Sequence, residues 1–236
     1  MSSILGHSLA GVCVASAVGG EQVVRKRKLL ILTAVLALVP DLDVIIYIAF
    51  GAMGINPHRG ITHTLLFTVL AGASISLLVG KRFDLTFAKG FVLFTGVLLS
   101  HLVLDYLMGA GPGVPFFWPL SDQGYLFPYK IVPTAYYTLS ATGILSLLFY
   151  PPTLIGLFFE ALIFLPLFLM LTRKATLPRW FLVTITIVGL LCTLVIYNVI
   201  VPTRDAPTAD SRDVAPKYLR TEIGKSDPAS VLPTSA

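Results

Sequence analysis

The sequence is poor in charge and in cysteine. Charged residues make up 12% of the 236 positions, about half of the roughly 25% that a soluble domain carries. Two cysteines occur, Cys13 and Cys192, and both lie in apolar stretches without a CxxC spacing. The sequence therefore gives no case for a disulfide or a thiolate metal site, and it favours two small buried side chains.

Hydrophobic residues dominate the composition instead. They make up 56% of the chain, and the mean hydropathy is +0.85. Several runs approach the length of about 20 apolar residues that a membrane-spanning helix needs. The runs are continuously apolar, whereas the strands of a membrane β-barrel alternate. The sequence predicts an all-α, polytopic membrane bundle of about five to seven membrane-embedded helices.

The net charge of +5 does not indicate nucleic-acid binding, because the basic residues sit in short clusters between apolar runs. This is the pattern of cytoplasmic loops. We expect three clusters on the inside of an inner or plasma membrane, which places both termini on the extracytoplasmic side. No basic residue precedes the first apolar stretch, so we expect residues 4–20 to be a retained membrane helix or half-helix and not a cleavable signal. The clusters are RKRK (25–28), KRFDLTFAK (81–89) and RKATLPR (173–179).

The apolar runs define a membrane domain over residues 1–201, followed by a polar tail over residues 202–236 that we expect to be flexible. Two points stay open: residues 134–172 cross the membrane once or three times, and the sequence does not fix the oligomeric state. After the first stretch, the expected helices cover residues 29–50 (interrupted by PDLD at 40–43), 61–80, 86–108, 153–172 and 180–201.

Seven ionisable residues fall near the predicted outer face or the middle of the membrane. Intramembrane ionisable residues indicate function by default, but each has a plainer explanation. His7 is explained as an interfacial side chain, the two aspartates of PDLD as helix caps, and His101 with Asp105 as an i,i+4 pair that satisfies itself. A common site explains all of them together: His7, Asp41, Asp43, His58, His63, His101 and Asp105.

Neutral imidazole and carboxylate are ligands that suit Zn²⁺, Mn²⁺ or Fe²⁺. The candidate set is large enough for two ions bridged by a carboxylate, an arrangement that acidifies a water and stabilises both oxygens of an ester displacement. Asp41 and Asp43 cannot be ranked as ligands. Arg59 is explained equally well as a bidentate phosphate contact or as an interfacial side chain that reaches the headgroups.

Five motifs occur in this order along the chain: GHSLAG (6–11), PDLD (40–43), HRGITHTLL (58–66), LSHLVLDYL (99–107) and GVPFFWP (113–119). Together they resemble the motifs of the YdjM-like family of membrane-bound, metal-dependent hydrolases. The resemblance covers residues 5 to about 120. It extends distantly to the helical zinc-dependent phospholipase C and single-strand nuclease group, which holds several zinc ions on helices.

The resemblance implies a helical phosphoester hydrolase in which His101 and Asp105 form the HxxxD pair. It also implies that His7, Asp41 and His63 are further ligands. The chain departs from the soluble enzymes because no histidine follows His101, and Glu160 stands alone as a late acid in an apolar run. We therefore expect one or two ions, most readily zinc.

Three functions remain open at the level of the sequence. The first is hydrolysis of a phosphoester, such as a lipid-linked one, with Asp43 or Asp105 orienting the attacking water and Arg59 contacting phosphate. The second is transport of a divalent cation or of protons. The third is a non-catalytic membrane protein held together by metal. The aromatic residues of GVPFFWP suit an interfacial belt or a wall on the substrate side of the site.

Overall fold

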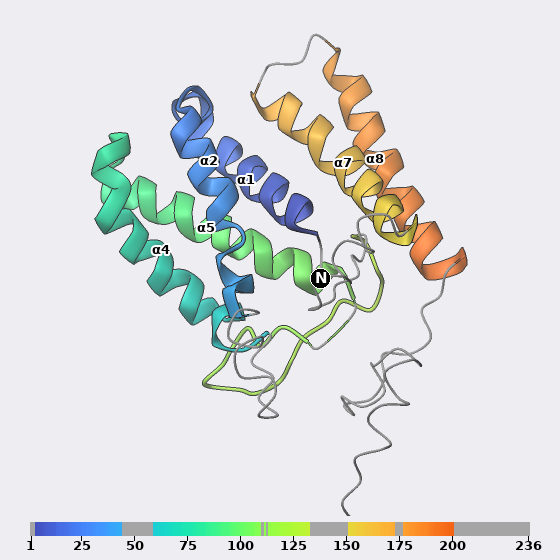
Figure 1. Cartoon of the computed structure of the whole chain (residues 1–236), viewed down its shortest axis with the longest axis horizontal. Coiled ribbons are helices and arrows are strands. Elements are labelled where there is room, and N and C mark those ends of the chain that lie inside the picture. Colours follow the sequence, from blue (N-terminus) through green and yellow to red (C-terminus); the bar gives the residue numbers. More distant parts are fainter. Residues whose placement is uncertain are drawn as a thin grey trace, which may run out of the picture. The chain divides into compact units, whose positions relative to one another are not determined.

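The computed structural model describes residues 3–43, 59–109, 111, 113–132, 151–172 and 177–200, and all structural statements below refer to these (Figure 1). His58, the run 134–150 and the tail 202–236 lie outside the described residues, so the predictions made for them stay predictions. The described part is helical, and its single β-type contact is an isolated bridge between Val114 and Tyr125.

Helix α1 (Ile4–Arg25) begins at Ser3, whose hydroxyl accepts a hydrogen bond from the Gly6 amide at 3.0 Å. This is a conventional N-cap, which satisfies one of the free amides at a helix start. The helix kinks at Gly20, which has a φ of 54°, a conformation that only glycine adopts without strain. The sequence predicted a loop after residue 20, whereas helix continues beyond the kink to Arg25.

Helix α2 (Arg27–Leu36) returns alongside α1, and the two pack against each other (Figure 1). Its 10 residues measure about 15 Å, half of a hydrocarbon core. The predicted interruption of the run 29–50 is confirmed: α2 ends at Leu36, and Pro40 lies in the separate 3-10 turn η1 (Val39–Leu42), while residues 44–50 lie outside the described part of the chain. Proline has no amide hydrogen and interrupts a helix ladder.

The third and fourth predicted helices are present. After the 3-10 turn η3 (Ile61–His63), helix α4 (Leu65–Val79) is capped by Thr64 and ends in the 3-10 turn η4 (Gly80–Phe83). Helix α5 (Phe87–Leu107) is capped by Thr86. The two helices pack closely because Gly72 faces the backbone of Thr95, where a side-chain carbon would lie 2.8 Å from the amide nitrogen.

Helix α7 (Pro151–Thr172) begins two residues before the expected helix 153–172, and α8 (Arg179–Val195) continues into the π-helical turn η5 (Ile196–Ile200). The α7 helix packs on both α1 and α8. Five described segments are long and apolar enough to cross a membrane, which confirms the all-α polytopic prediction. They are Ile4–Arg25, Leu65–Phe83, Phe87–Leu107, Thr153–Thr172 and Arg179–Val199.

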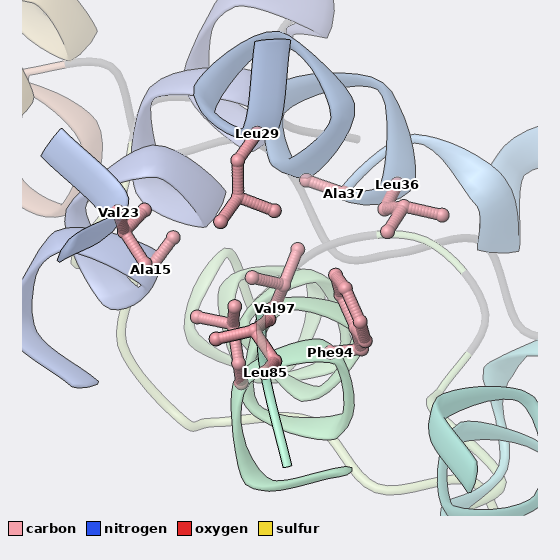
Figure 2. Packing of buried hydrophobic residues seen from close by; sticks show 9 residues of the cluster. Ala15, Val23, Leu29, Leu36, Ala37, Leu85, Phe94 and Val97 are labelled. Carbon is pink, nitrogen blue, oxygen red and sulfur yellow. The ribbon is translucent and has the colours of Figure 1, made fainter. Parts of the chain in front are cut away.

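The main hydrophobic core lies where α1, α2 and α5 meet (Figure 2). Leu29 and Leu36 of α2 approach Phe94 and Val97 of α5, and all four are buried. In a membrane bundle such side chains stabilise the helix contacts through close van der Waals packing, because lipid tails are as apolar as the side chains themselves. The core therefore fixes α2 and the turn that follows it against α5, which positions Asp41 and Asp43 relative to His101 and Asp105.

Helix α7 is tied to the start of α1 by a buried carboxylate. Glu160 is 1% exposed, and its two oxygens accept hydrogen bonds from the backbone amide of Ser3, at 2.8 Å, and from the Ser3 hydroxyl. The late acid that stood alone in the sequence thus holds the N-cap of α1. We assign it a structural role, distant from the HxxxD motif in sequence.

Candidate metal centre

Four side chains from three elements converge in the interior. Asp41 comes from η1, His63 from η3, and His101 and Asp105 from α5. Each offers one ligand atom, and the four atoms all lie within 4.8 Å of one another. His63, His101 and Asp105 are fully buried. Two imidazole nitrogens and two carboxylate oxygens at this spacing can hold a divalent metal ion.

The backbone fixes which nitrogen of His101 faces the cluster. Its Nδ1 lies 2.7 Å from the carbonyl oxygen of Ala37. A carbonyl only accepts, so Nδ1 carries the hydrogen and the lone pair of the neutral ring is on Nε2. That atom lies 3.4 Å from Asp41 Oδ1 and 3.2 Å from His63 Nε2. Metal-binding histidines are oriented in this way by a bond from the other ring nitrogen.

His63 is oriented by a carboxylate. Its Nδ1 lies 3.3 Å from Asp43 Oδ2 and 3.1 Å from the Thr62 hydroxyl. The same Asp43 oxygen accepts hydrogen bonds from the Arg59 amide at 2.9 Å and from Thr62 at 3.2 Å. This is the carboxylate–histidine arrangement that supports metal ligands. The structure thus distinguishes the two aspartates of PDLD: Asp41 faces the cluster, and Asp43 lies behind His63.

The surroundings of His63 favour positive charge. Burial alone would lower its pKa, but the nearby carboxylates of Asp105, Asp41 and Asp43, at 3.3 to 3.6 Å from its ring nitrogens, outweigh burial and raise the pKa to about 10. For Asp41, burial would raise the pKa, but His101 and His63 outweigh it and hold the pKa well below the ordinary value. The carboxylates that stabilise a proton on His63 also attract a metal cation to the same place.

Asp105 lies at the middle of the cluster and is fully buried. Its Oδ2 is 3.5 Å from His63 Nε2 and 3.1 Å from Arg59 Nε, and its Oδ1 is 3.6 Å from His7 Nε2. The contacts with the two histidines are longer than hydrogen bonds. Asp105 therefore presents one oxygen to the four-residue group and the other to His7.

His7 borders the four-residue group without belonging to it. Its ring stacks on His101 with centroids 3.8 Å apart. The side chain is fully buried, and neither ring nitrogen has a hydrogen-bond partner among the described residues. Buried polar atoms without partners are rare and call for an explanation such as an ion or water. Asp41 Oδ1 and both oxygens of Asp105 have the same property.

Arg59 is buried against the cluster and does not extend outward to headgroups. It is 5% exposed, and its guanidinium pairs with Asp105. Its φ of 57° is unusual for a residue with a side chain. This backbone turn lets the Arg59 amide reach Asp43 while its side chain reaches Asp105.

The site as a whole carries a negative charge. The carboxylates of Asp41, Asp43 and Asp105 and the guanidinium of Arg59 sum to a formal charge of −2 (1 − 3) when the histidines are neutral.

A cavity of about 250 Å³ adjoins the cluster through Arg59. The segment 113–119 contributes Pro115 and Trp118 to its wall, and Ile61 and Asp122 complete the opposite sides. The segment is held beside η3 because the Leu65 amide donates to the Phe116 carbonyl at 3.0 Å. The aromatic motif GVPFFWP therefore lies beside the site.

The structure brings together most of the residues that the sequence selected. His7, Asp41, Asp43, Arg59, His63, His101 and Asp105 are all in or against the cluster, and His58 lies outside the described residues. One detail was wrong: the expected helix 61–80 includes His63, whereas His63 lies in η3 and precedes α4.

Three groups that contribute to the cluster or its cavity were not predicted from the sequence. They are Thr62, the Ala37 carbonyl and Asp122. The position of Thr62 next to His63 could have indicated a role, although many threonines beside functional residues make no contact with the site. A backbone carbonyl carries no signal in the sequence, and Asp122 lies after the recognised motif.

The described residues define a multi-pass helical membrane protein with a buried histidine–aspartate cluster suited to a metal ion. The chain belongs to the YdjM inner membrane protein family, which matches residues 1–199. It is similar to the inner membrane protein YbcI of Escherichia coli (strain K12), with 29% identity over 144 residues that cover 59% of this chain and 80% of YbcI. No solved structure matches the chain. These findings confirm the family resemblance and support a multi-pass inner-membrane location.

Proposed function

We propose that this chain is a membrane-embedded, metal-dependent hydrolase that cleaves a phosphoester. The observation that supports this most directly is the group Asp41, His63, His101 and Asp105, whose ligand atoms lie within 4.8 Å of one another beside a cavity. The oxygens of Asp41 and Asp105 that face the group have no hydrogen-bond partner among the described residues. A divalent ion would satisfy them.

The donor set fits zinc, with manganese or iron as alternatives, because it combines two imidazoles with two carboxylates. When bound, such an ion acidifies water and stabilises negative charge on an ester oxygen. The formal charge of −2 on Asp41, Asp43, Asp105 and Arg59 is neutralised by one divalent ion. We therefore propose that the site holds one ion. A second ion would have to bind between His7 and the other oxygen of Asp105.

The other residues have distinct proposed roles. Asp43 orients His63, since its Oδ2 already accepts hydrogen bonds from the Arg59 amide and from Thr62. This engagement makes Asp43 a positioning residue and leaves Asp105 and His7 as the groups that handle protons. Arg59 contacts Asp105 and also lines the cavity, so it is placed to contact a phosphate oxygen that enters there.

The cavity limits which part of a substrate is enclosed. Its volume of about 250 Å³ is below the roughly 300–1,000 Å³ of pockets that enclose drug-sized ligands. It suits a phosphate group with a few attached carbons, and the remainder of a lipid-linked substrate would stay outside. Ile61, Pro115 and Trp118 provide an apolar wall for that part. We propose that the site faces the extracytoplasmic side, opposite the lysine- and arginine-rich loops.

The test combines elemental analysis with an activity assay on the full chain purified in detergent. We expect near-stoichiometric zinc, manganese or iron, and hydrolysis of bis(p-nitrophenyl) phosphate or of a phospholipid. Asp105→Asn keeps the shape of the side chain but removes its charge, so bound metal and turnover should both fall. Ser74→Ala is the control, because the Ser74 hydroxyl bonds its own helix at the Leu70 carbonyl. A wild-type protein without bound metal would sink the proposal.

The second candidate is a metal-stabilised protein without turnover. It is favoured by the fact that the cluster joins α1, η1, η3 and α5, so an ion would also hold these elements together. Stoichiometric metal without hydrolysis of any phosphoester tested would select this candidate. Cation transport is less well supported, because His7 and the group Asp41, His63, His101 and Asp105 gather at one end of α1 and α5 and do not extend through the described bundle. A metal flux in liposomes that His101→Ala abolishes would reverse that ranking.

A further inference from the structure

The end of α1 opposite the cluster carries a concentration of positive charge. Seven cations lie on the α1–α2 corner and on the turn between α4 and α5. The two regions are joined because Lys26 Nζ contacts Asp84 Oδ2 at 2.7 Å and the Phe83 carbonyl at 2.6 Å. The seven are Arg25, Lys26, Arg27, Lys28, Lys81, Arg82 and Lys89; we call this set, together with Glu21 and Asp84, the basic end.

Both acids of the basic end are already engaged. Glu21 pairs with Arg25 at 3.1 Å, and Asp84 pairs with Lys26. Seven cations against two carboxylates give a formal charge of +5 (7 − 2). Among the described residues, Arg27, Lys28 and the remaining cations of this end make no ion pair, and they are exposed to solvent. This surface therefore attracts an anion.

A cavity of about 570 Å³ opens at the same end, between the second half of α1 and the last turn of α7. Ser16, Gly20 and Arg25 line it from α1, and Leu171 and Thr172 line it from α7. The kink at Gly20 contributes to the opening, since a carbon added to Gly20 would meet no atom within 4 Å. Glu21 also lines the cavity, where it is paired with Arg25.

A buried hydroxyl indicates that the cavity takes a polar occupant. Ser16 is 2% exposed, and its Oγ has no hydrogen-bond partner among the described residues. A buried hydroxyl without a partner is unfavourable, and this one lines the cavity. An occupant with a phosphate or hydroxyl oxygen would satisfy it, while Leu171 and Val24 offer apolar contacts to carbon atoms.

We propose that this cavity binds the headgroup of an anionic phospholipid. The shared chemistry is a phosphate oxygen that meets the Ser16 hydroxyl and the cations around Arg25. A lipid is favoured over free phosphate because the cavity lies at the end of two apolar, membrane-length helices, where headgroups are found. Val18 of α1, next in sequence to the cavity-lining Ala17, is 47% exposed and offers an apolar side chain to an acyl chain. Clusters of lysine and arginine next to membrane helices attract anionic lipids in this way.

The experiment uses the full chain in detergent and measures thermal stabilisation and native mass spectra. The probes are a short-chain phosphatidylglycerol, the matched phosphatidylcholine and inorganic phosphate. We expect phosphatidylglycerol to bind most tightly and its affinity to fall with added salt. Arg27→Gln combined with Lys28→Gln should weaken that binding by on the order of 25-fold, at about fivefold for each cation removed.

Ser16→Ala separates the cavity from the surface charge. It removes only the unpartnered hydroxyl, so the fold should tolerate it, and binding of phosphatidylglycerol should fall by about fivefold, as for one lost hydrogen bond. Ser74→Ala is the matched hydroxyl control. The pair Lys217→Gln and Lys225→Gln, from residues 203–236, is the matched charge control, and neither should change lipid binding. The Tm of each variant without added lipid serves as the check that it is folded.

Three results would overturn the proposal. They are equal binding of phosphatidylcholine, equal stabilisation by inorganic phosphate alone, and unchanged phosphatidylglycerol binding in both the Ser16 variant and the Arg27/Lys28 variant. None of these results bears on the metal centre, because the measurement contains no phosphoester turnover. Failure of this proposal is therefore distinguishable from failure of the proposed hydrolase.

Discussion

The two ends of α1 carry charges of opposite sign and accommodate them in opposite ways. At the start of the helix, His7 lies against buried Asp105, whose carboxylate pairs with the buried guanidinium of Arg59. At the other end, Arg25 and Lys26 pair loosely with Glu21 and Asp84, whose side chains are 65% and 84% exposed. Water satisfies the second set, whereas buried charge must find a specific partner. The difference explains why the acidic end indicates a bound metal ion. It also explains why the basic end indicates an anionic partner, such as lipid headgroups.

The largest expected effect is at the buried end. His101→Ala removes a ligand whose ring is fixed by the Ala37 carbonyl, and it also removes the ring on which His7 stacks. Metal affinity should fall by more than the 10–100-fold that loss of an outer-shell partner produces. Lys89→Ala at the basic end is the control and should keep full metal content by elemental analysis. Equal metal content in the two variants would contradict the comparison.

Removal of the ion should destabilise the protein as a whole. An ion that binds only the folded chain stabilises it by about 2.7 kcal/mol when its concentration is 100 times its Kd. A chelator should therefore lower the Tm in detergent, and added zinc should restore it. The same chelator should leave the Tm of His101→Ala unchanged. A wild-type Tm that does not respond to chelation would argue that the cluster is satisfied without metal.

Asp43→Asn tests the positioning role at the same end. The amide would still face His63 Nδ1, but it would no longer offer a charged oxygen to the Arg59 amide, Thr62 and the ring. We expect a 10–100-fold weaker metal affinity with unchanged stoichiometry at saturating metal. Titration with a metal-binding dye separates affinity from stoichiometry. Complete loss of the site would instead make Asp43 a direct ligand.

The smallest effect should come from the exposed end. Lys26→Gln breaks the contact with Asp84, but exposed pairs contribute only about 0–1 kcal/mol. The Tm should move by little, and the metal content should not change. If Lys26→Gln destabilised the protein as much as His101→Ala, the contrast between the two ends would be wrong.

The sequence was most informative where a structural feature depends only on residues close together in the chain. Long apolar runs predicted α4, α5, α7 and α8, and the HxxxD spacing placed His101 and Asp105 on one face of α5. The break at PDLD was predicted as well, but the end of α2 was not, because the apolar run continues from Leu36 to Val39 while the regular helix stops at Leu36. Apolar composition alone does not indicate that Pro40 lacks an amide hydrogen, or that the turn η1 packs on α5.

The candidate site could be predicted as a list of residues but not as a geometry. Asp41 and Asp43 are separated by one residue, and only the 3-10 turn decides that one faces the cluster and the other supports His63. The contact of Ser3 with Glu160 joins positions that no motif links. Arg59 had two explanations in the sequence, and only its burial against Asp105 distinguishes them.

The bond between Ser3 and Glu160 has a consequence for the order in which the chain is made. The two residues are 157 positions apart, so at about 5–20 residues per second roughly 8 to 30 seconds of synthesis separate them. The cluster residues from His7 to Asp105 are all complete much earlier. During that interval α1 must stay in place through α2 and α5 alone. The proposed binding of a metal ion therefore does not have to wait for translation of the C-terminal helices, and the contact with α7 is added to a helix whose cluster residues have already been made.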